Sequence, residues 1–392
     1  MTSIEAGVPR FVLGRETATR QDVHSTPLGY SRELLQVGET LPIPAAAELV
    51  DRLDVQTSVT VALNSSLGDS LLALSSVQAV LDWLRLRHPS REVRVAVEGR
   101  HAALVCRAVP LGLLEPVAGP TILIGDRVTV DKHAGDVIPI VCNPAAPPCW
   151  ASSWRVHTDL PARYYLALER RLGVRLPANG GFCPLLLAPD PSANPVVRAL
   201  GMDGWSAGRT IAVITATSWP ERKDYTVARY LRMAEHLAER SATDVRLLVV
   251  GGEATTPETS AIDNTGPRVR ALRMDGVPAV DLADVFALCD LVIGNDTGLT
   301  HLAALSRRPD GGGPPVVGLY ARHSYSKWTT GLDHHHAVAT TFSERMHQGD
   351  LCPVRDALGT HADGGLAAIT PKYLADLAAG LLPGAGRPGG SK

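Results

Sequence analysis

Residues 295–302 could bind a phosphate group. They read Asn-Asp-Thr-Gly-Leu-Thr-His-Leu and follow the apolar run 291–293. The pattern predicts a strand at 291–293, a turn at 294–298 and a helix from 299. Such a turn lies at the carboxyl end of a strand, where open α/β sheets bind ligands, and the N–H groups at a helix start favour anions. His301 lies one turn inside that helix and could add a donor. An ordinary helix capped by Asp296 or Thr297 is equally consistent with the pattern.

A second polar stretch could supply a carboxylate. Residues 65–69 read Ser-Ser-Leu-Gly-Asp, follow the strand-like run 58–63 and precede apolar residues at helical spacing over 71–86. Asp69 therefore falls in the first turn of a helix at the carboxyl end of a strand. From its position alone, the favoured interpretation is structural: Asp69 stabilises the positive end of the helix by about 0.3–1 kcal/mol. The alternative is a general base that takes the proton from a substrate hydroxyl.

A third polar stretch, residues 217–225, reads Thr-Ser-Trp-Pro-Glu-Arg-Lys-Asp-Tyr and follows the expected strand 210–214. Four of its side chains could bind a phosphate: the hydroxyls of Thr217 and Ser218 and the cations of Arg222 and Lys223. The residues alone do not decide whether Lys223 or Arg222 faces the ligand. For Arg222 a solvated pair with Glu221 is an equally good interpretation.

Alternating strands and helices would place all of these stretches at the carboxyl edges of parallel sheets. In the first half, we expect strands at 58–63, 93–97, 121–124 and 137–141 and helices at 71–86 and 160–172. In the second half, we expect strands at 210–214, 245–250, 269–272, 291–293 and 316–319 and helices at 226–240, 282–289 and 299–305.

The chain has 392 residues, enough for two domains of ordinary size. The pattern predicts an α/β protein with two doubly wound Rossmann-like domains facing a cleft. Residues 1–55 are interpreted as an N-terminal extension that packs on the first domain or is partly loose. The expected domains are 56–190 and 191–382, with a Pro/Gly-rich linker at 189–208. A final helix, 371–382, could pack back on the first domain, and 383–392 is expected to be a disordered tail.

Composition narrows the class of protein. The chain is 45% hydrophobic and 20% charged with a formal net charge of −2, which predicts a soluble globular protein without a basic surface for nucleic acid. No apolar run approaches the roughly 18 residues of a transmembrane helix, and no secretory signal is evident. Six scattered cysteines indicate reduced thiols in the cytoplasm.

Metal binding is not expected. The chain has no Asp-x-Asp motif, and no spaced cluster of metal-ligating residues is evident. The run His334-His335-His336 is interpreted as a loop, because consecutive side chains cannot converge on one ion.

Taken in order, these stretches make the chain similar to glycosyltransferase family 9, the lipopolysaccharide-type heptosyltransferases. The likeness spans about residues 57–330. Its segments are 65–74, His157 with 165–173, 217–225, 247–253, and 295–302 with 316–320.

The resemblance implies the GT-B architecture, with 56–190 as the acceptor domain and 191–382 as the nucleotide-sugar domain. It also implies an inverting, metal-independent transfer of a sugar, usually heptose from ADP-heptose, to an acceptor hydroxyl. A natural product or a cell-envelope glycan are the acceptors considered. Two alternatives remain open: a sugar-nucleotide 2-epimerase and a non-catalytic GT-B binding protein.

The resemblance also assigns roles to residues. Asp69 matches the catalytic carboxylate, and Glu253 would accept from the ribose hydroxyls or be a plain surface residue. Asp296 would bind the transferred sugar. In the family's pattern a lysine is followed, two residues later, by an aromatic residue, which favours Lys223 as the cation that faces the ligand and makes Arg222 the second choice. The remaining donor-site residues are Thr217, Ser218, Thr297, Gly298, Leu299 and His301, and the acceptor loop would contain Ser65, Ser66 and Gly68.

Overall fold

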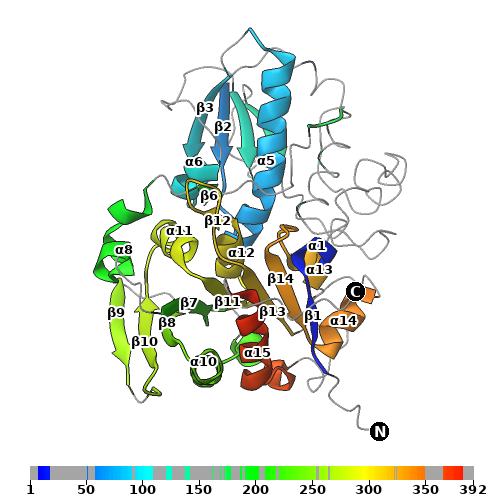
Figure 1. Cartoon of the computed structure of the whole chain (residues 1–392). Helices are drawn as coiled ribbons and strands as arrows, with labels where there is room; N and C mark the ends of the chain where they lie inside the picture. Colours follow the sequence, from blue (N-terminus) through cyan, green and yellow to red (C-terminus); the bar gives the residue numbers. More distant parts are fainter. Residues whose placement is uncertain are drawn as a thin grey trace.

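Two separate sheets, one parallel and one mostly parallel, form the frame of the protein (Figure 1). The computed structural model describes residues 8–17, 58–90, 93–108, 121–125, 137–141 and, with short gaps, 186–348 and 365–382, together with positions 51, 161, 168, 172 and 174–177. The expected helix 160–172, most of the N-terminal extension and the tail 383–392 therefore lie largely outside the described residues.

The smaller sheet has four parallel strands in the order β3-β2-β4-β5. Val59 and Val61 of its central strand β2 are buried, as expected for β-branched residues beneath a helix. The long helix α5 follows β2 directly and is apolar on nearly all sides because it packs on this sheet and also reaches the other half of the molecule. The bounds are β2 (Ser58–Ala62), α5 (Leu67–Arg87), β3 (Arg94–Glu98), α6 (Ala102–Ala108), β4 (Thr121–Gly125) and β5 (Val137–Val141).

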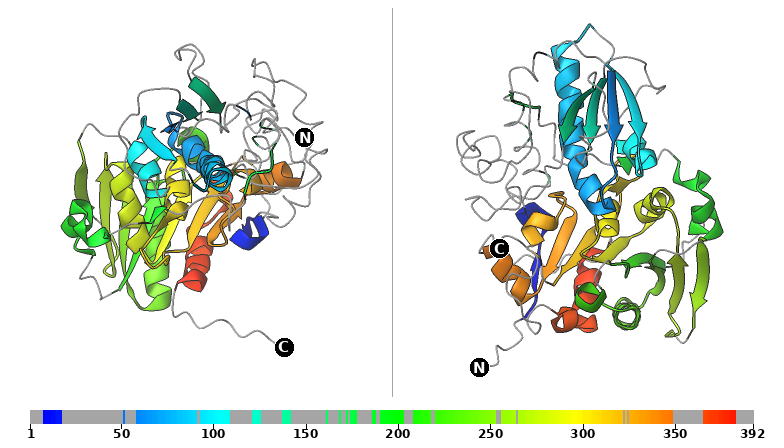
Figure 2. Two further views of the ribbon diagram at one scale, coloured as in Figure 1. Left: turned by 90° about the horizontal axis from the view of Figure 1, so that it is seen from above. Right: turned by 180° about the vertical axis from the view of Figure 1, so that it is seen from behind.

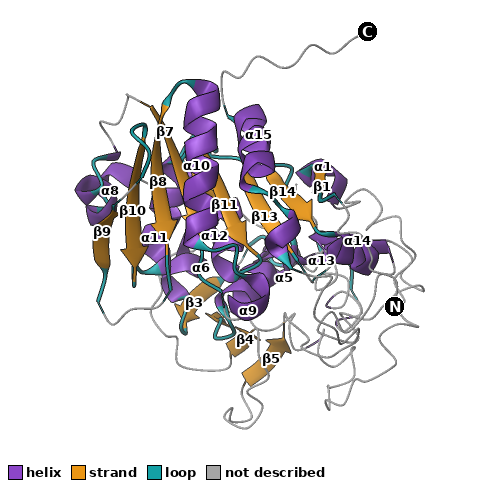
Figure 3. Ribbon diagram, turned by 90° about the horizontal axis from the view of Figure 1, so that it is seen from below, coloured by secondary structure: helices purple, strands orange, loops and turns teal. Residues whose placement is uncertain are grey.

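The larger sheet has eight strands in the order β1-β14-β13-β11-β7-β8-β10-β9, parallel except for the two edge strands. Its central strands are buried on both faces, which explains their continuous Val, Ile and Leu runs. Figure 3 shows α10 and α15 on one face and α11 and α12 on the other. The strands are β1 (Arg10–Val12), β7 (Gly208–Ile214), β8 (Asp244–Val250), β9 (Glu258–Ile262), β10 (Val269–Asp275), β11 (Leu291–Asn295), β13 (Val316–Tyr320) and β14 (His335–Ala339).

The helices of this half are α8 (Pro195–Ala199), α9 (Pro220–Lys223), α10 (Val227–Ser241), α11 (Ala279–Leu288), α12 (Gly298–Leu305), α13 (Tyr325–Trp328), α14 (Thr341–Gln348) and α15 (Pro371–Leu381). Short pieces complete the described chain: α1 (Gly14–Thr17), β6 (Leu186–Leu187), β12 (Ser306–Arg307), η3 (Pro191–Ala193) and η5 (Leu366–Ala368).

Three expectations about the ends and the histidines are wrong. The described part of the N-terminal extension joins the larger sheet, because β1 pairs antiparallel with β14, and so does not pack on the first domain. The final helix α15 packs against α10 of the second half instead of crossing back. His335 and His336 lie in the buried strand β14 and not in a loop.

The two halves meet where α5 contacts α12 (Figures 1 and 2). One apolar cluster runs from Val61 through Leu71 of α5 to Leu302 of α12, so the contact is packed and not merely close. A second connection is the ion pair between Arg107 of α6 and Asp284 of α11, with two N–O distances of 2.6 and 3.1 Å.

Candidate active site

The first turns of α5 and α12 touch. A Cβ built on Gly298 would lie 2.5 Å from the backbone nitrogen of Gly68, and one built on Gly68 would lie 3.2 Å from the Cα of Gly298. Each helix starts at the carboxyl end of a central strand, β2 or β11, so the two carboxyl edges face each other. Glycine at both positions allows this approach, which brings Asp69 from one half beside the helix start of the other.

Asp69 is fixed by its own helix cap. The Ser66 hydroxyl donates to Asp69 Oδ2 at 2.7 Å and accepts from the Asp69 N–H at 3.5 Å. The side chain is half-buried, and no described residue hydrogen-bonds its other oxygen, Oδ1. The carboxylate is therefore oriented while keeping one oxygen available to a substrate.

The start of α12 offers backbone donors. Thr297 is the N-cap, yet its side chain makes no capping hydrogen bond. The N–H groups of Gly298 and Leu299 belong to the first helical turn, which has no intrahelical acceptor for them. These donors and the positive end of the helix favour an anion at this point.

His301 lies directly beneath this helix start. Its side chain is 2% exposed, and its Nδ1 has no hydrogen-bond partner in the part of the chain that the structure describes. Burial lowers the pKa of His301 to about 4, so the ring is neutral at pH 7. A neutral imidazole can still donate one hydrogen bond.

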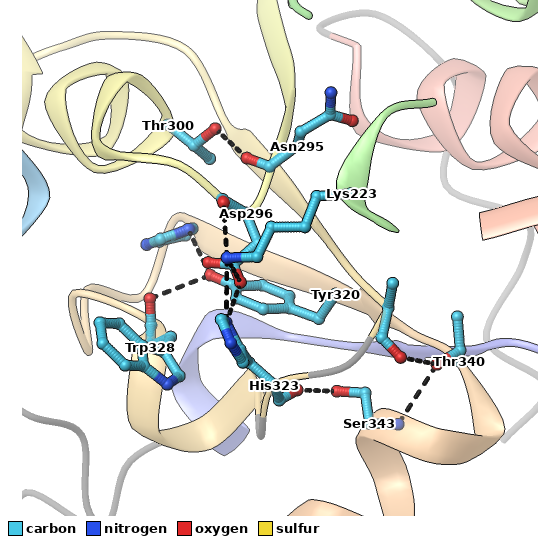
Figure 4. A network of polar contacts seen from close by, with 11 residues as sticks. Lys223, Asn295, Asp296, Thr300, Tyr320, His323, Trp328, Thr340 and Ser343 are labelled. Atoms are coloured by element: carbon cyan, nitrogen blue, oxygen red, sulfur yellow. Dashed lines mark hydrogen bonds and ion pairs between the residues drawn. The ribbon is translucent and has the colours of Figure 1, made fainter. Parts of the chain in front are cut away.

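Lys223 contacts Asp296 (Figure 4). Its ammonium lies 2.9 Å from Asp296 Oδ2 and 3.4 Å from the Asp296 carbonyl. His323 Nδ1 contacts the same carboxylate oxygen. Burial alone would raise the pKa of Asp296, but the Lys223 charge and the His323 ring outweigh it and hold this pKa well below its usual range. Asp296 is therefore a carboxylate with two partners.

Hydrogen bonds of Asn295 fix the turn that carries Asp296. The Asn295 side chain accepts from the Tyr225 N–H at 3.2 Å and donates to the Thr215 carbonyl at 3.3 Å. The Thr300 hydroxyl donates to the Asn295 carbonyl at 2.6 Å. These bonds tie the turn to the loop after β7, so the two predicted polar stretches are one structural unit.

The remaining predicted residues lie around this unit. Thr217 is half-buried in the loop after β7, and Ser65 is buried, with its carbonyl 3.0 Å from His101 Nε2. Ser218, Glu253 and the side chain of Arg222 lie outside the described residues.

Sequence reasoning missed His323. It follows the strand β13 by three residues, and the rule that polar residues cluster at the carboxyl ends of strands could have found it.

A comparison with known proteins identifies the family of the second half of the chain. Residues 192–355 match the family model described as glycosyltransferase family 9 (heptosyltransferase). Residues 192–355 of this chain therefore form a heptosyltransferase-like glycosyltransferase domain of family 9. The resemblance expected from the sequence is thereby confirmed, and so is the enzyme class. A search of curated proteins finds no match to the chain.

Solved structures agree on the fold of the whole chain. The glycosyl transferase family 9 structure from Veillonella parvula is 15% identical, with a TM-score of 0.51 over 84% of this chain and 98% of that one. The E. coli ADP-heptose lps heptosyltransferase II is 14% identical, with a TM-score of 0.51 over 83% and 98%. E. coli heptosyltransferase WaaC with ADP is 13% identical, with a TM-score of 0.50 over 82% and 98%. The fold is thus the expected GT-B fold.

The described residues include neither a candidate metal site nor a candidate membrane-spanning helix. They contain no group of three or more side chains that could hold a metal ion. No helix in the described ranges has the length and apolarity to cross a membrane.

Proposed function

We propose that this glycosyltransferase moves a heptose from ADP-heptose to an acceptor hydroxyl with inversion at the sugar carbon. The observation that carries the proposal is the contact between Gly68 and Gly298. It sets a half-buried carboxylate, Asp69, beside a helix start with unsatisfied N–H groups. One transfer needs both: a base for the acceptor and donors for the leaving diphosphate.

Asp69 is the base in this proposal. Its Oδ1 accepts the proton of the acceptor hydroxyl, while Ser66 holds Oδ2 at 2.7 Å. The acceptor oxygen then attacks the sugar carbon on the face opposite the diphosphate, so a single displacement inverts that carbon. The acceptor loop also contains Ser65 and Gly68.

The second half of the protein binds the donor. The N–H groups of Gly298 and Leu299, with Thr297 and His301, receive the diphosphate, and the ammonium of Lys223 neutralises part of its charge. Asp296 and its partners border the transferred sugar. Thr217 and Ser218 complete the phosphate contacts, Glu253 accepts from the ribose, and Arg222 is the second cation.

The nucleotide is proposed by analogy with the E. coli structures, one named an ADP-heptose heptosyltransferase and the other a complex with ADP. Because helix N-termini and lysine serve the diphosphate, we propose that no metal is required. The acceptor is proposed to be a natural product or a cell-envelope glycan, and the compartment the cytoplasm.

The test is ADP release from ADP-heptose with a panel of glycan and natural-product acceptors, with proton NMR of the product. We expect acceptor-dependent ADP release and an inverted anomeric centre. A sugar-nucleotide isomer formed without ADP would instead identify an epimerase. Tight ADP-heptose binding without turnover on any acceptor would indicate a binding protein.

A thermal-shift series with ADP, UDP, GDP and dTDP tests the nucleotide, since a ligand specific for the folded state raises its stability. ADP should give the largest shift. A larger shift with UDP would contradict the assignment of the donor.

A further inference from the structure

His323 is a buried residue without a role in the proposal so far. Its side chain is 4% exposed, and its Nδ1 contacts Asp296 Oδ2, the oxygen that also accepts from Lys223. A carboxylate oxygen only accepts, so His323 Nδ1 must carry the hydrogen in this contact. It follows that Nδ1 has no lone pair for Lys223, although the two nitrogens lie 3.1 Å apart.

This assignment determines which acceptors are left for the three N–H groups of Lys223. An ammonium has three N–H groups. One is directed at Asp296 Oδ2 at 2.9 Å and one at the Asp296 carbonyl at a long 3.4 Å. Since His323 Nδ1 cannot accept, the third N–H has no acceptor among the described residues and is available to a ligand.

The surroundings hold the His323 ring in place (Figure 4). The Trp328 ring stacks on it with centroids 5.3 Å apart and planes at 27°. The Tyr320 hydroxyl donates to the Trp328 carbonyl at 3.1 Å, and the Ser343 hydroxyl donates to the His323 carbonyl. Residues from β13, α13 and α14 thus fix one imidazole against one carboxylate.

We propose that His323 is a positioning residue for Lys223, acting through Asp296, and that it sets the affinity of the site for a diphosphate. With His323 present, the buried carboxylate keeps a charge-assisted hydrogen bond when Lys223 shares its hydrogens with the ligand. Without His323, Lys223 is the only side chain in the described residues that donates to Asp296, and turning it toward a phosphate would leave a buried charge poorly compensated. The proposal rests on the proposed function, because it assumes a diphosphate at this site.

A double-mutant cycle tests the coupling, with ADP and inorganic pyrophosphate as calorimetric probes. His323→Ala should raise the Kd for ADP about ten-fold, a coupling of ordinary size for residues in one network. In a Lys223→Ala background, His323→Ala should add less than two-fold. His323→Asn should bind ADP within about two-fold of wild type, because its amide can donate from nearly the Nδ1 position.

His336→Ala is the matched control. It also removes a buried ring and one hydrogen bond, from the Gly14 N–H at 3.0 Å, but it does not touch Lys223 or Asp296. It should lower the melting temperature without changing the Kd for ADP.

The outcomes separate the two proposals. Wild-type affinity in His323→Ala, or an undiminished effect in the Lys223→Ala background, would overturn the positioning role. If the wild-type protein binds pyrophosphate but not ADP, the proposal of an ADP-linked donor would be wrong. The Kd for pyrophosphate would then be compared across the double-mutant cycle to test the positioning role. Binding of neither probe would overturn both.

Discussion

Gly298→Ala perturbs the contact on which the assembled site depends. The added Cβ would lie 2.5 Å from the Gly68 nitrogen, 3.1 Å from the Gly68 Cα and 3.2 Å from the Leu67 carbonyl carbon. All of these are backbone atoms, so no side chain can rotate away. An ordinary contact begins at 3.4 Å, and the start of α5 must therefore retreat by about 0.9 Å.

The expected loss follows from that displacement. Asp69 moves with α5, and misplacing a reacting group by about 1 Å can cost roughly 10²-fold in rate. Gly298 is not among the residues with positive φ, so alanine suits the backbone conformation there. We therefore expect kcat for ADP release to fall by roughly 10²-fold while the protein remains folded.

Gly380→Ala is the control for this substitution. Gly380 is also helical, in α15, and a Cβ built on it meets no atom within 4 Å. It should raise stability by about 0.5–1 kcal/mol, from the helix preference of alanine, and leave kcat unchanged. A Gly298→Ala enzyme with wild-type kcat would refute the reasoning that the two helix starts must touch for catalysis.

Further predictions concern pH, metal and the contact between the halves. Burial lowers the pKa of His301 and His336 to about 4 and holds the pKa of His335 well below its usual value. An unfolded histidine titrates near 6.5, so only the unfolded chain gains these protons between about pH 6.5 and 4. Urea unfolding should show full stability above pH 6.5 and a fall of up to about 1.4 kcal/mol per pH unit per histidine below it; a flat profile would contradict the burial of neutral rings. EDTA-treated enzyme should keep most of its rate, because amides and Lys223 serve the diphosphate; complete loss restored by Mg²⁺ would contradict this. Arg107→Ala removes the ion pair between α6 and α11, so small-angle scattering should show a larger radius of gyration without ligand, and an unchanged radius would mean that the apolar contact suffices.

The sequence predicted the parts of the fold that local patterns control. The buried strands β7, β8, β11 and β13 carry continuous apolar runs, so their positions could be read directly. The polar residues after β2 and β11 were placed at carboxyl edges by the same logic, and the structure brings those two edges together.

The rest depended on contacts between distant residues. The strand β1 has only three residues and pairs with β14 more than 300 positions away, so no local pattern identifies its partner. β9 is exposed along most of its length and has no apolar alternation.

The strand β14 begins with two histidines, which are poor strand signals. Each is satisfied by a partner that only the fold supplies: His335 Nδ1 accepts from the Thr330 N–H at 3.1 Å, and His336 Nδ1 from the Gly14 N–H at 3.0 Å. The Lys223–Asp296–His323 arrangement likewise joins helix α9 to the segments that follow β11 and β13, and these partners could not be read from spacing.

The most direct test of the central claim is the rate of ADP release by Asp69→Asn, measured beside the Kd for ADP. Asparagine keeps the shape of the side chain but cannot take a proton, so kcat should fall by roughly 10²-fold or more while the Kd stays within about two-fold of wild type. Asp82→Asn, on the same helix and away from Gly298, should match wild type in both measurements. An Asp69→Asn enzyme that releases ADP at the wild-type rate would contradict the account and reduce Asp69 to a residue that stabilises the start of α5.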